Sequence, residues 1–193
     1  MGIGLLGLLA ALTGCGTTVT VKATAQQPSV TLTGQRIYVA VNDQGASPYL
    51  NQHVRRQLKR ALTARGVRET EKPEEAAYRL EFSYGVDGGE PEPSTAPPAR
   101  LMNQITRQYE VVYSPPGEVQ YAKRLKLRLV PIADPSRPAW IGEATNVGES
   151  NDLRDVVDFL IAAGIEQLGR ETGSPIARRF WPLSDPIGSM KRE

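Results

Sequence analysis

The chain has 193 residues, with 23 Lys and Arg against 21 Asp and Glu, so its formal net charge is only +2. A charge this close to balance argues against nucleic-acid binding as the main function. The length suits one domain with tails, and it is sufficient to bury a core without disulfides. The single cysteine, Cys15, excludes an intrachain disulfide.

The most informative stretch is Leu12-Thr13-Gly14-Cys15, which follows an apolar run that begins at Ile3. About ten apolar residues are too few to cross a bilayer but are typical of a signal-peptide core. An aliphatic residue, two small residues and a cysteine form a lipobox. The pattern predicts that signal peptidase recognises Leu12, Thr13 and Gly14 and that the Cys15 thiol receives diacylglycerol. We therefore expect residues 1–14 to be a signal peptide and acyl chains such as palmitate on Cys15 to anchor the chain.

The residues around the lipobox also bear on the start and the destination of the protein. No Lys or Arg precedes Cys15, although a signal peptide usually carries a positive amino-terminal region. We expect the true start to lie upstream, in preference to an atypical signal. Gly16 stands where many inner-membrane lipoproteins carry Asp. An outer-membrane location facing the periplasm is therefore favoured.

The remaining sequence divides into regular elements. Residues 15–34 are rich in Thr, Ala and Gln, which favours a tether after the lipidated cysteine, although alternation around Val19 and Val21 is also compatible with a strand. Alternating or β-branched apolar residues predict strands at 36–41, 78–86, 105–113, 119–130 and 140–147. Apolar residues at helical spacing predict two helices, from Pro48 to Gly66 and from Asn151 or Asp152 to Gly169.

This order of elements predicts an α+β fold for residues 35–172. We expect a mainly antiparallel sheet of four to six strands with two amphipathic helices packed on one face. Residues 87–100 contain four prolines and two adjacent glycines, a composition typical of a long loop. Residues 173–193 form a basic-aromatic carboxyl-terminal tail, which is expected either to pack over the core or to dock on a membrane or a partner.

Four short stretches of the chain resemble the bacterial envelope lipoproteins that carry the 4136-type domain of unknown function. They are Ile37–Val41, Leu62–Gly66, Glu75–Leu80 and Pro138–Ala144. The resemblance covers about Gln35 to Leu168. Because that family has no established activity, the resemblance implies a fold and an envelope location but no reaction.

Two basic sets are candidate binding surfaces for an anionic partner or lipid headgroup. The first lies on the predicted helix after Pro48 and comprises Arg55, Arg56, Lys59 and Arg60. Its simpler interpretation is a solvated helix face. The second alternates along a predicted strand and comprises Arg124, Lys126 and Arg128. This row either faces an acidic partner or protects a sheet edge against pairing with another chain.

The sequence lacks the residue patterns that support catalysis. His53 is the only histidine, so a histidine-rich metal site is excluded and any triad with a histidine base must use this residue. We expect no enzyme activity, no cofactor and no metal. The leading hypothesis is an accessory, binding or scaffolding lipoprotein with an envelope protein partner and no nucleic acid. The alternative is a carrier for a lipid or other amphiphile, which an apolar cavity beside Arg124 or Arg128 would favour.

Overall fold

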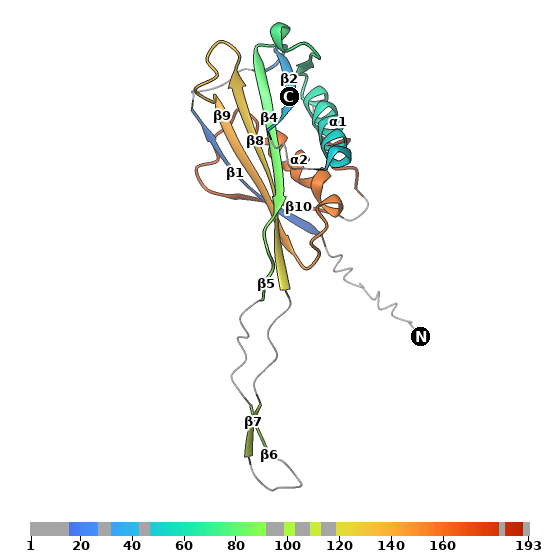
Figure 1. Cartoon of the computed structure of the whole chain (residues 1–193), viewed down its shortest axis with the longest axis vertical. Coiled ribbons are helices and arrows are strands. Elements are labelled where there is room, and N and C mark those ends of the chain that lie inside the picture. The colour runs from blue at the N-terminus through green and yellow to red at the C-terminus, as the bar shows by residue number, and fades with distance from the viewer. Residues whose placement is uncertain are drawn as a thin grey trace, which may run out of the picture.

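The structure is a computed structural model that describes residues 16–26, 32–42, 47–91, 99–102, 109–112, 119–181 and 184–190. The predicted signal peptide, Leu12, Thr13, Gly14 and Cys15 lie outside these residues. Figure 1 shows one long sheet with helices α1 (Pro48–Ala64) and α2 (Val157–Glu166) beside it. Two short 3-10 helices, η1 (Pro73–Glu75) and η2 (Leu153–Asp155), complete the helical elements described.

The main sheet has eight strands, which is more than the four to six predicted. Seven follow the order β10-β1-β9-β8-β4-β2-β3, and β5 pairs with β8. Their bounds are β1 (Thr17–Ala25), β2 (Arg36–Val41), β3 (Arg68–Glu69), β4 (Tyr78–Val86), β5 (Glu90–Pro91), β8 (Val119–Pro131), β9 (Trp140–Gly148) and β10 (Ile176–Phe180). A separate two-stranded sheet pairs β6 (Ala99–Met102) with β7 (Tyr109–Val112).

The sheet is mixed, although most of its neighbours run antiparallel. The exceptions are on β2, which runs parallel to both β3 and β4. Helix α1 lies between β2 and β4 in the chain, as a parallel pair requires a crossover connection. Gly66 ends this unit in a left-handed conformation with φ of 75°, which confirms its predicted place after the helix.

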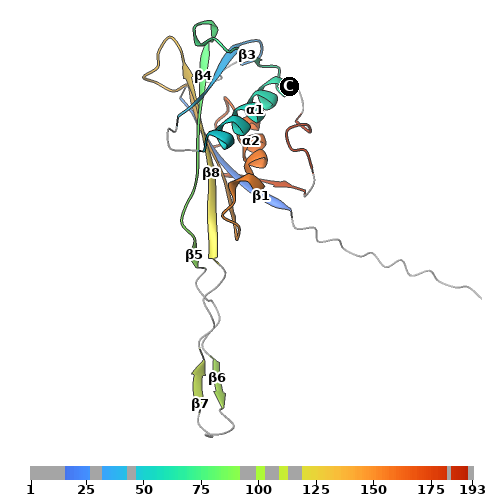
Figure 2. The same cartoon turned by 45° about the vertical axis from the view of Figure 1, so that its right-hand side comes forward.

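Both helices cover the same face of the sheet, as predicted (Figure 2). On β8, Leu125, Leu127 and Leu129 point to this inner face and are at most 1% exposed. Phe82 on β4 and Trp140 on β9 continue the same layer. The alternate residues of β8 point to the opposite, outer face, so the strand has the period of two that one buried face demands.

Helix α2 differs from the amphipathic helix that the sequence predicts. Every residue from Leu160 to Ile165 is buried, because α2 contacts three strands and α1, and Phe159 packs on Phe180 with ring centroids 5.2 Å apart. The predicted helix also begins with the separate turn η2. By contrast, α1 is amphipathic and buries Val54, Gln57, Leu58, Ala61 and Leu62.

Both ends of the predicted domain require correction. Over Thr17–Ala25 the strand alternative holds in place of a tether, because β1 lies within the sheet between β9 and β10. The tail of residues 173–193 contributes β10 and the buried side chain of Ile187. The folded unit therefore extends beyond residues 35–172 in both directions. In addition, β5 falls within the predicted loop 87–100, and β6 overlaps the end of that loop.

Candidate functional site

The basic set of α1 is largely engaged with acidic residues that follow the helix. Arg55 Nη2 lies 3.0 Å from Glu71 Oε2, and Lys59 Nζ lies 2.5 Å from Glu69 Oε1 and also contacts Glu71. Burial lowers the pKa of Lys59, but hydrogen bonds to Glu69 and Glu71 outweigh it and leave the pKa raised. This half of the set stabilises the turn after α1 and offers little uncompensated charge to a ligand.

The other half of the set belongs to a polar network between the helices. His53 Nε2 lies 2.9 Å from Asp158 Oδ1 on α2, and Arg56 Nη2 lies 3.3 Å from His53 Nδ1. A guanidinium can only donate, so Nδ1 accepts and Nε2 carries the proton in the neutral ring. Gln57 donates to the second Asp158 oxygen at 3.0 Å. The only histidine therefore has a structural role in joining α1 to α2.

Arg60 extends this network to the carboxyl-terminal segment. Its guanidinium donates to Gln57 Oε1 at 2.8 Å and lies 3.2 Å from Asp185 Oδ2. The backbone N–H of Gly188 donates to Asp185 Oδ1 at 2.9 Å. That bond, followed by the contact with Arg60, lowers the pKa of Asp185. Arg60 thus holds the segment after β10 against α1.

The basic row of β8 lies on the outer face. Its side chains form ion pairs with acids that lie on β4, directly after β4, or on β9. Arg124 Nη2 lies 2.6 Å from Asp87, Arg128 Nη1 lies 3.1 Å from Glu81, and Lys126 Nζ lies 3.7 Å from Glu143. Strand β8 is central, between β4 and β9. The row therefore does not protect a sheet edge, and that alternative is wrong.

The two predicted basic sets do not form one site. The α1 set lies on the helix that covers the inner face, whereas Arg124, Lys126 and Arg128 project from the outer face. A single small anion therefore cannot contact both sets. The separation was not predictable from residue spacing, because it depends on which face of β4 and β8 the helices cover.

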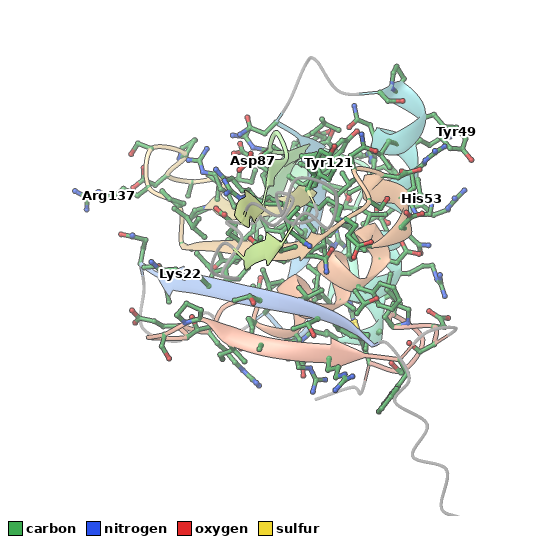
Figure 3. All side chains as sticks on the ribbon, turned by 90° about the horizontal axis from the view of Figure 1, so that it is seen from below. Lys22, Tyr49, His53, Asp87, Tyr121 and Arg137 are labelled. Carbon is green, nitrogen blue, oxygen red and sulfur yellow. The ribbon has the colours of Figure 1, made fainter. Side chains whose placement is uncertain are left out.

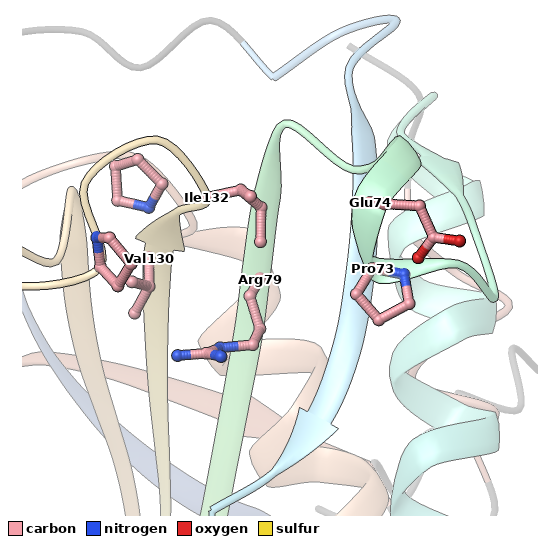
Figure 4. A pocket seen from close by; sticks show the side chains of 7 residues that line it. Pro73, Glu74, Arg79, Val130 and Ile132 are labelled. Carbon is pink, nitrogen blue, oxygen red and sulfur yellow. The ribbon is translucent and has the colours of Figure 1, made fainter.

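A pocket of about 370 Å³ lies at one end of the outer face (Figure 4). It is lined by Pro73, Glu74, Arg79, Val130, Pro131, Ile132 and Pro135. Arg79 is the cation of the pocket, and its guanidinium lies 2.7 Å from Glu81. Neither Arg124 nor Arg128 lines the pocket. The aromatic side chains of Phe82 and Tyr84 on β4 do not line the pocket either, since Phe82 is fully buried and Tyr84 donates to Asn51 Oδ1 at 2.9 Å.

The sequence interpretation missed a corner where the start of β1 meets the end of β10. Thr17 pairs with Phe180 and Thr18 with Arg179, and Figure 3 shows the two strands side by side at the edge of the sheet. A Cβ added to Gly16 would come within 2.9 Å of the Phe180 carbonyl oxygen. The basic-aromatic composition of the tail was visible in the sequence, but its pairing with β1 was not.

Two further observations on the described residues concern membrane spans and metal sites. Neither helix in these parts of the chain combines the length and the hydrophobicity that a membrane span needs. The same residues contain no group of three or more His, Cys, Asp and Glu side chains placed to hold a metal ion.

No family model matches the sequence, and no curated protein matches it. Among solved structures, the fold is similar to that of a PDZ domain protein from Parabacteroides distasonis ATCC 8503, with a TM-score of 0.57 and 16% sequence identity. The alignment covers 85% of this chain but only 39% of that protein. At this identity the similarity shows the fold alone. The resemblance to the 4136-type domain stays a prediction.

Two weaker similarities involve other bacterial proteins. One is to a PelC dodecamer from Paraburkholderia phytofirmans, with a TM-score of 0.47, 16% identity and coverage of 79% of this chain and 99% of that one. The other is to a minor lipoprotein from Acinetobacter baumannii, with a TM-score of 0.32, 15% identity and coverage of 70% and 86%. Similarities at this level do not support a functional inference.

Proposed function

We propose that the protein is a lipid-anchored bacterial envelope lipoprotein with a non-catalytic accessory or scaffolding role at the outer membrane. The observation that carries this proposal is the lipobox ending at Cys15, two residues before β1 begins at Thr17. An extended chain advances at most about 3.6 Å per residue. An acyl group on Cys15 therefore holds the sheet itself, and not a distant domain, at the membrane surface.

Confinement at the membrane supplies the proposed mechanism. A tethered domain meets partners in the same membrane at a much higher effective concentration than a free one. The outer face of the sheet is the surface proposed to meet an envelope protein, because neither helix covers it. Its charges are already paired at Arg124–Asp87 and Arg128–Glu81, so recognition there would use alternating charge and not a single basic patch.

Intact mass and membrane fractionation of the native protein test the anchor. The wild type is expected to begin at Cys15, to carry the mass of its acyl chains and to fractionate with the outer membrane. Cys15→Ser is expected to lose the acyl mass and to leave the outer-membrane fraction. A matched variant, Thr18→Ser, lies beyond the lipobox and is expected to behave as the wild type. An unacylated wild-type protein would contradict the proposal.

We propose an amphiphile carrier as the second candidate function, and the observation that supports it is the pocket beside Arg79, in place of the expected cavity beside Arg124 or Arg128. Its volume of about 370 Å³ lies within the range usual for small-molecule sites, and proline, valine and isoleucine supply most of its lining. Titration with a fluorescent fatty acid tests this function. Ile132→Trp is expected to fill the pocket and abolish binding, whereas Val147→Trp on the exposed part of β9 is expected to leave it unchanged. Equal binding of the fatty acid by both variants would exclude this pocket as the binding site.

A further inference from the structure

The corner formed by β1 and β10 brings aromatic and basic side chains to the first described residue after Cys15. Gly16 lies against Arg179 and Phe180, and a Cβ on Gly16 would come within 2.7 Å of Arg179 Nε. Trp181 follows Phe180 and is 59% exposed. The Arg179 guanidinium lies over its indole ring, 5.5 Å from the centroid. The pairing of β1 with β10 thus brings an exposed tryptophan to the end of the sheet where the predicted lipid is attached.

Two exposed arginines of β10, Arg178 and Arg179, lie at this corner. Arg178 and Arg179 lie on opposite faces of β10, because they pair with successive residues of β1. Arg178 Nε lies 2.9 Å from Glu166 at the end of α2, and the Arg178 side chain is still 51% exposed. The β1 residues paired with the two arginines, Thr18 and Val19, carry no charge.

Tryptophan and arginine together suit the boundary between water and lipid. The indole ring is apolar with one polar N–H, and tryptophan is enriched at the headgroup level of membranes. Each Lys or Arg near an anionic leaflet adds attraction to its phosphates. Phe180 does not supply this contact, because its ring packs on Phe159 within the fold. The exposed groups at this corner are Trp181 and the two arginines.

We propose that Arg178, Arg179 and Trp181 form a second membrane contact, which binds anionic phospholipid headgroups next to the acyl anchor. This inference rests on the proposed lipidation of Cys15, since the anchor brings the corner to the membrane. Two attachment points restrict rotation of the domain. The sheet then stands in a defined orientation, with β10 toward the lipid and the β8–β9 loop directed away from it.

Lipid quenching of tryptophan fluorescence tests the contact in the acylated, full-length mature protein. The chain has two tryptophans, and Trp140 is fully buried, so quenching by lipid should report Trp181. In vesicles that contain anionic phosphatidylglycerol and a phospholipid brominated near the glycerol, we expect strong quenching of Trp181. Trp181→Phe is expected to lose this quenching while its remaining Trp140 emission is unchanged.

A double variant and a matched control test the arginines. Arg178→Gln with Arg179→Gln is expected to reduce the quenching at least by half in anionic vesicles, and to abolish the difference between anionic and purely zwitterionic vesicles. Arg137→Gln alters an exposed arginine in the loop between β8 and β9, far from this corner (Figure 3). It is expected to match the wild type. Equal quenching in all three proteins would overturn the role of the arginines.

Two other outcomes separate the contact from the anchor. If intact mass shows acylation but Trp181 stays accessible to an aqueous quencher on vesicles, the membrane contact is overturned and the anchor stands. If Trp181 becomes protected only when envelope proteins are added, the corner binds a protein and the proposal is equally overturned. If the protein carries no acyl mass, the anchor fails, and bromolipid quenching of Trp181 in that sample would still support the lipid contact.

Discussion

The two faces of strand β8 show how one segment holds the fold together and also carries the charged surface. Leu125, Leu127 and Leu129 are at most 1% exposed beneath the helices. The alternate residues, Arg124, Lys126 and Arg128, have side chains that are 40% to 57% exposed. Burial of a leucine contributes about 1.5–3 kcal/mol, whereas an exposed ion pair contributes about 0–1 kcal/mol. Stability therefore resides mainly on the inner face, and the exposed ion pairs of the outer face can change with little cost.

The largest effect is expected on the inner face. Leu127→Ala should destabilise the fold by about 2–5 kcal/mol, because it removes a fully buried side chain and leaves a cavity. Lys126→Ala, the adjacent residue on the outer face, should change the free energy of unfolding by less than about 0.5 kcal/mol. Urea denaturation of both variants measures the difference. Comparable losses would refute the division of stability between the faces.

Close packing over Gly142 gives the next effect. A Cβ at Gly142 would lie 2.2 Å from Cη2 of Trp140, and Trp140 is held by a 2.9 Å hydrogen bond from its Nε1 to the Arg170 carbonyl. Gly142→Ala should therefore cost about 1–3 kcal/mol through overpacking. Gly85→Ala is the control, since a Cβ there meets no atom within 4 Å. Thermal unfolding should separate the two variants clearly.

A smaller effect is expected at the most buried acid of the outer face. Glu81 bridges Arg79 at 2.7 Å and Arg128 at 3.1 Å, and its side chain is only 11% exposed. Glu81→Gln should cost about 1.5 kcal/mol, because it weakens two charge-assisted hydrogen bonds. Glu143→Gln should have almost no effect, as Glu143 is 38% exposed and its contacts are 3.7 Å long. Chemical denaturation at neutral pH measures both.

The smallest effect concerns a charge pair at the surface. Hydrogen bonds from the Arg154 side chain and backbone lower the pKa of Asp152 from 3.8 to about 2. The ionised form is thus favoured in the folded state, so its contribution to stability is present above the unfolded pKa and is lost as the pH falls toward 2. Asp152→Asn should therefore make the free energy of unfolding depend slightly less on pH between pH 3.8 and about 2. Denaturation at stepped pH values tests this, and an unchanged slope would contradict it.

Much of the fold was predictable because several elements carry their own periodicity. The predicted strand 36–41 coincides with β2, and the predictions for β4, β8, β9 and α1 are correct to within about two residues of the observed bounds. Strand β10 was not predictable, because Ile176–Phe180 is almost wholly exposed and contains two arginines. Its extended form depends on hydrogen bonds to β1. The pattern of α2 likewise indicated a helix but not its burial on most sides.

By itself the sequence determined the alternation of β8 and the amphipathic face of α1, because each depends on the order of neighbouring residues, and it alone predicts lipidation at Cys15. Tertiary structure decided which residues far apart in the chain meet. It placed the two basic sets on opposite sides of the sheet, gave Arg124 and Arg128 their acidic partners, and brought Arg179 and Phe180 beside Gly16. These arrangements depend on strand order and register, which arise from packing across the whole sheet and have no local signature.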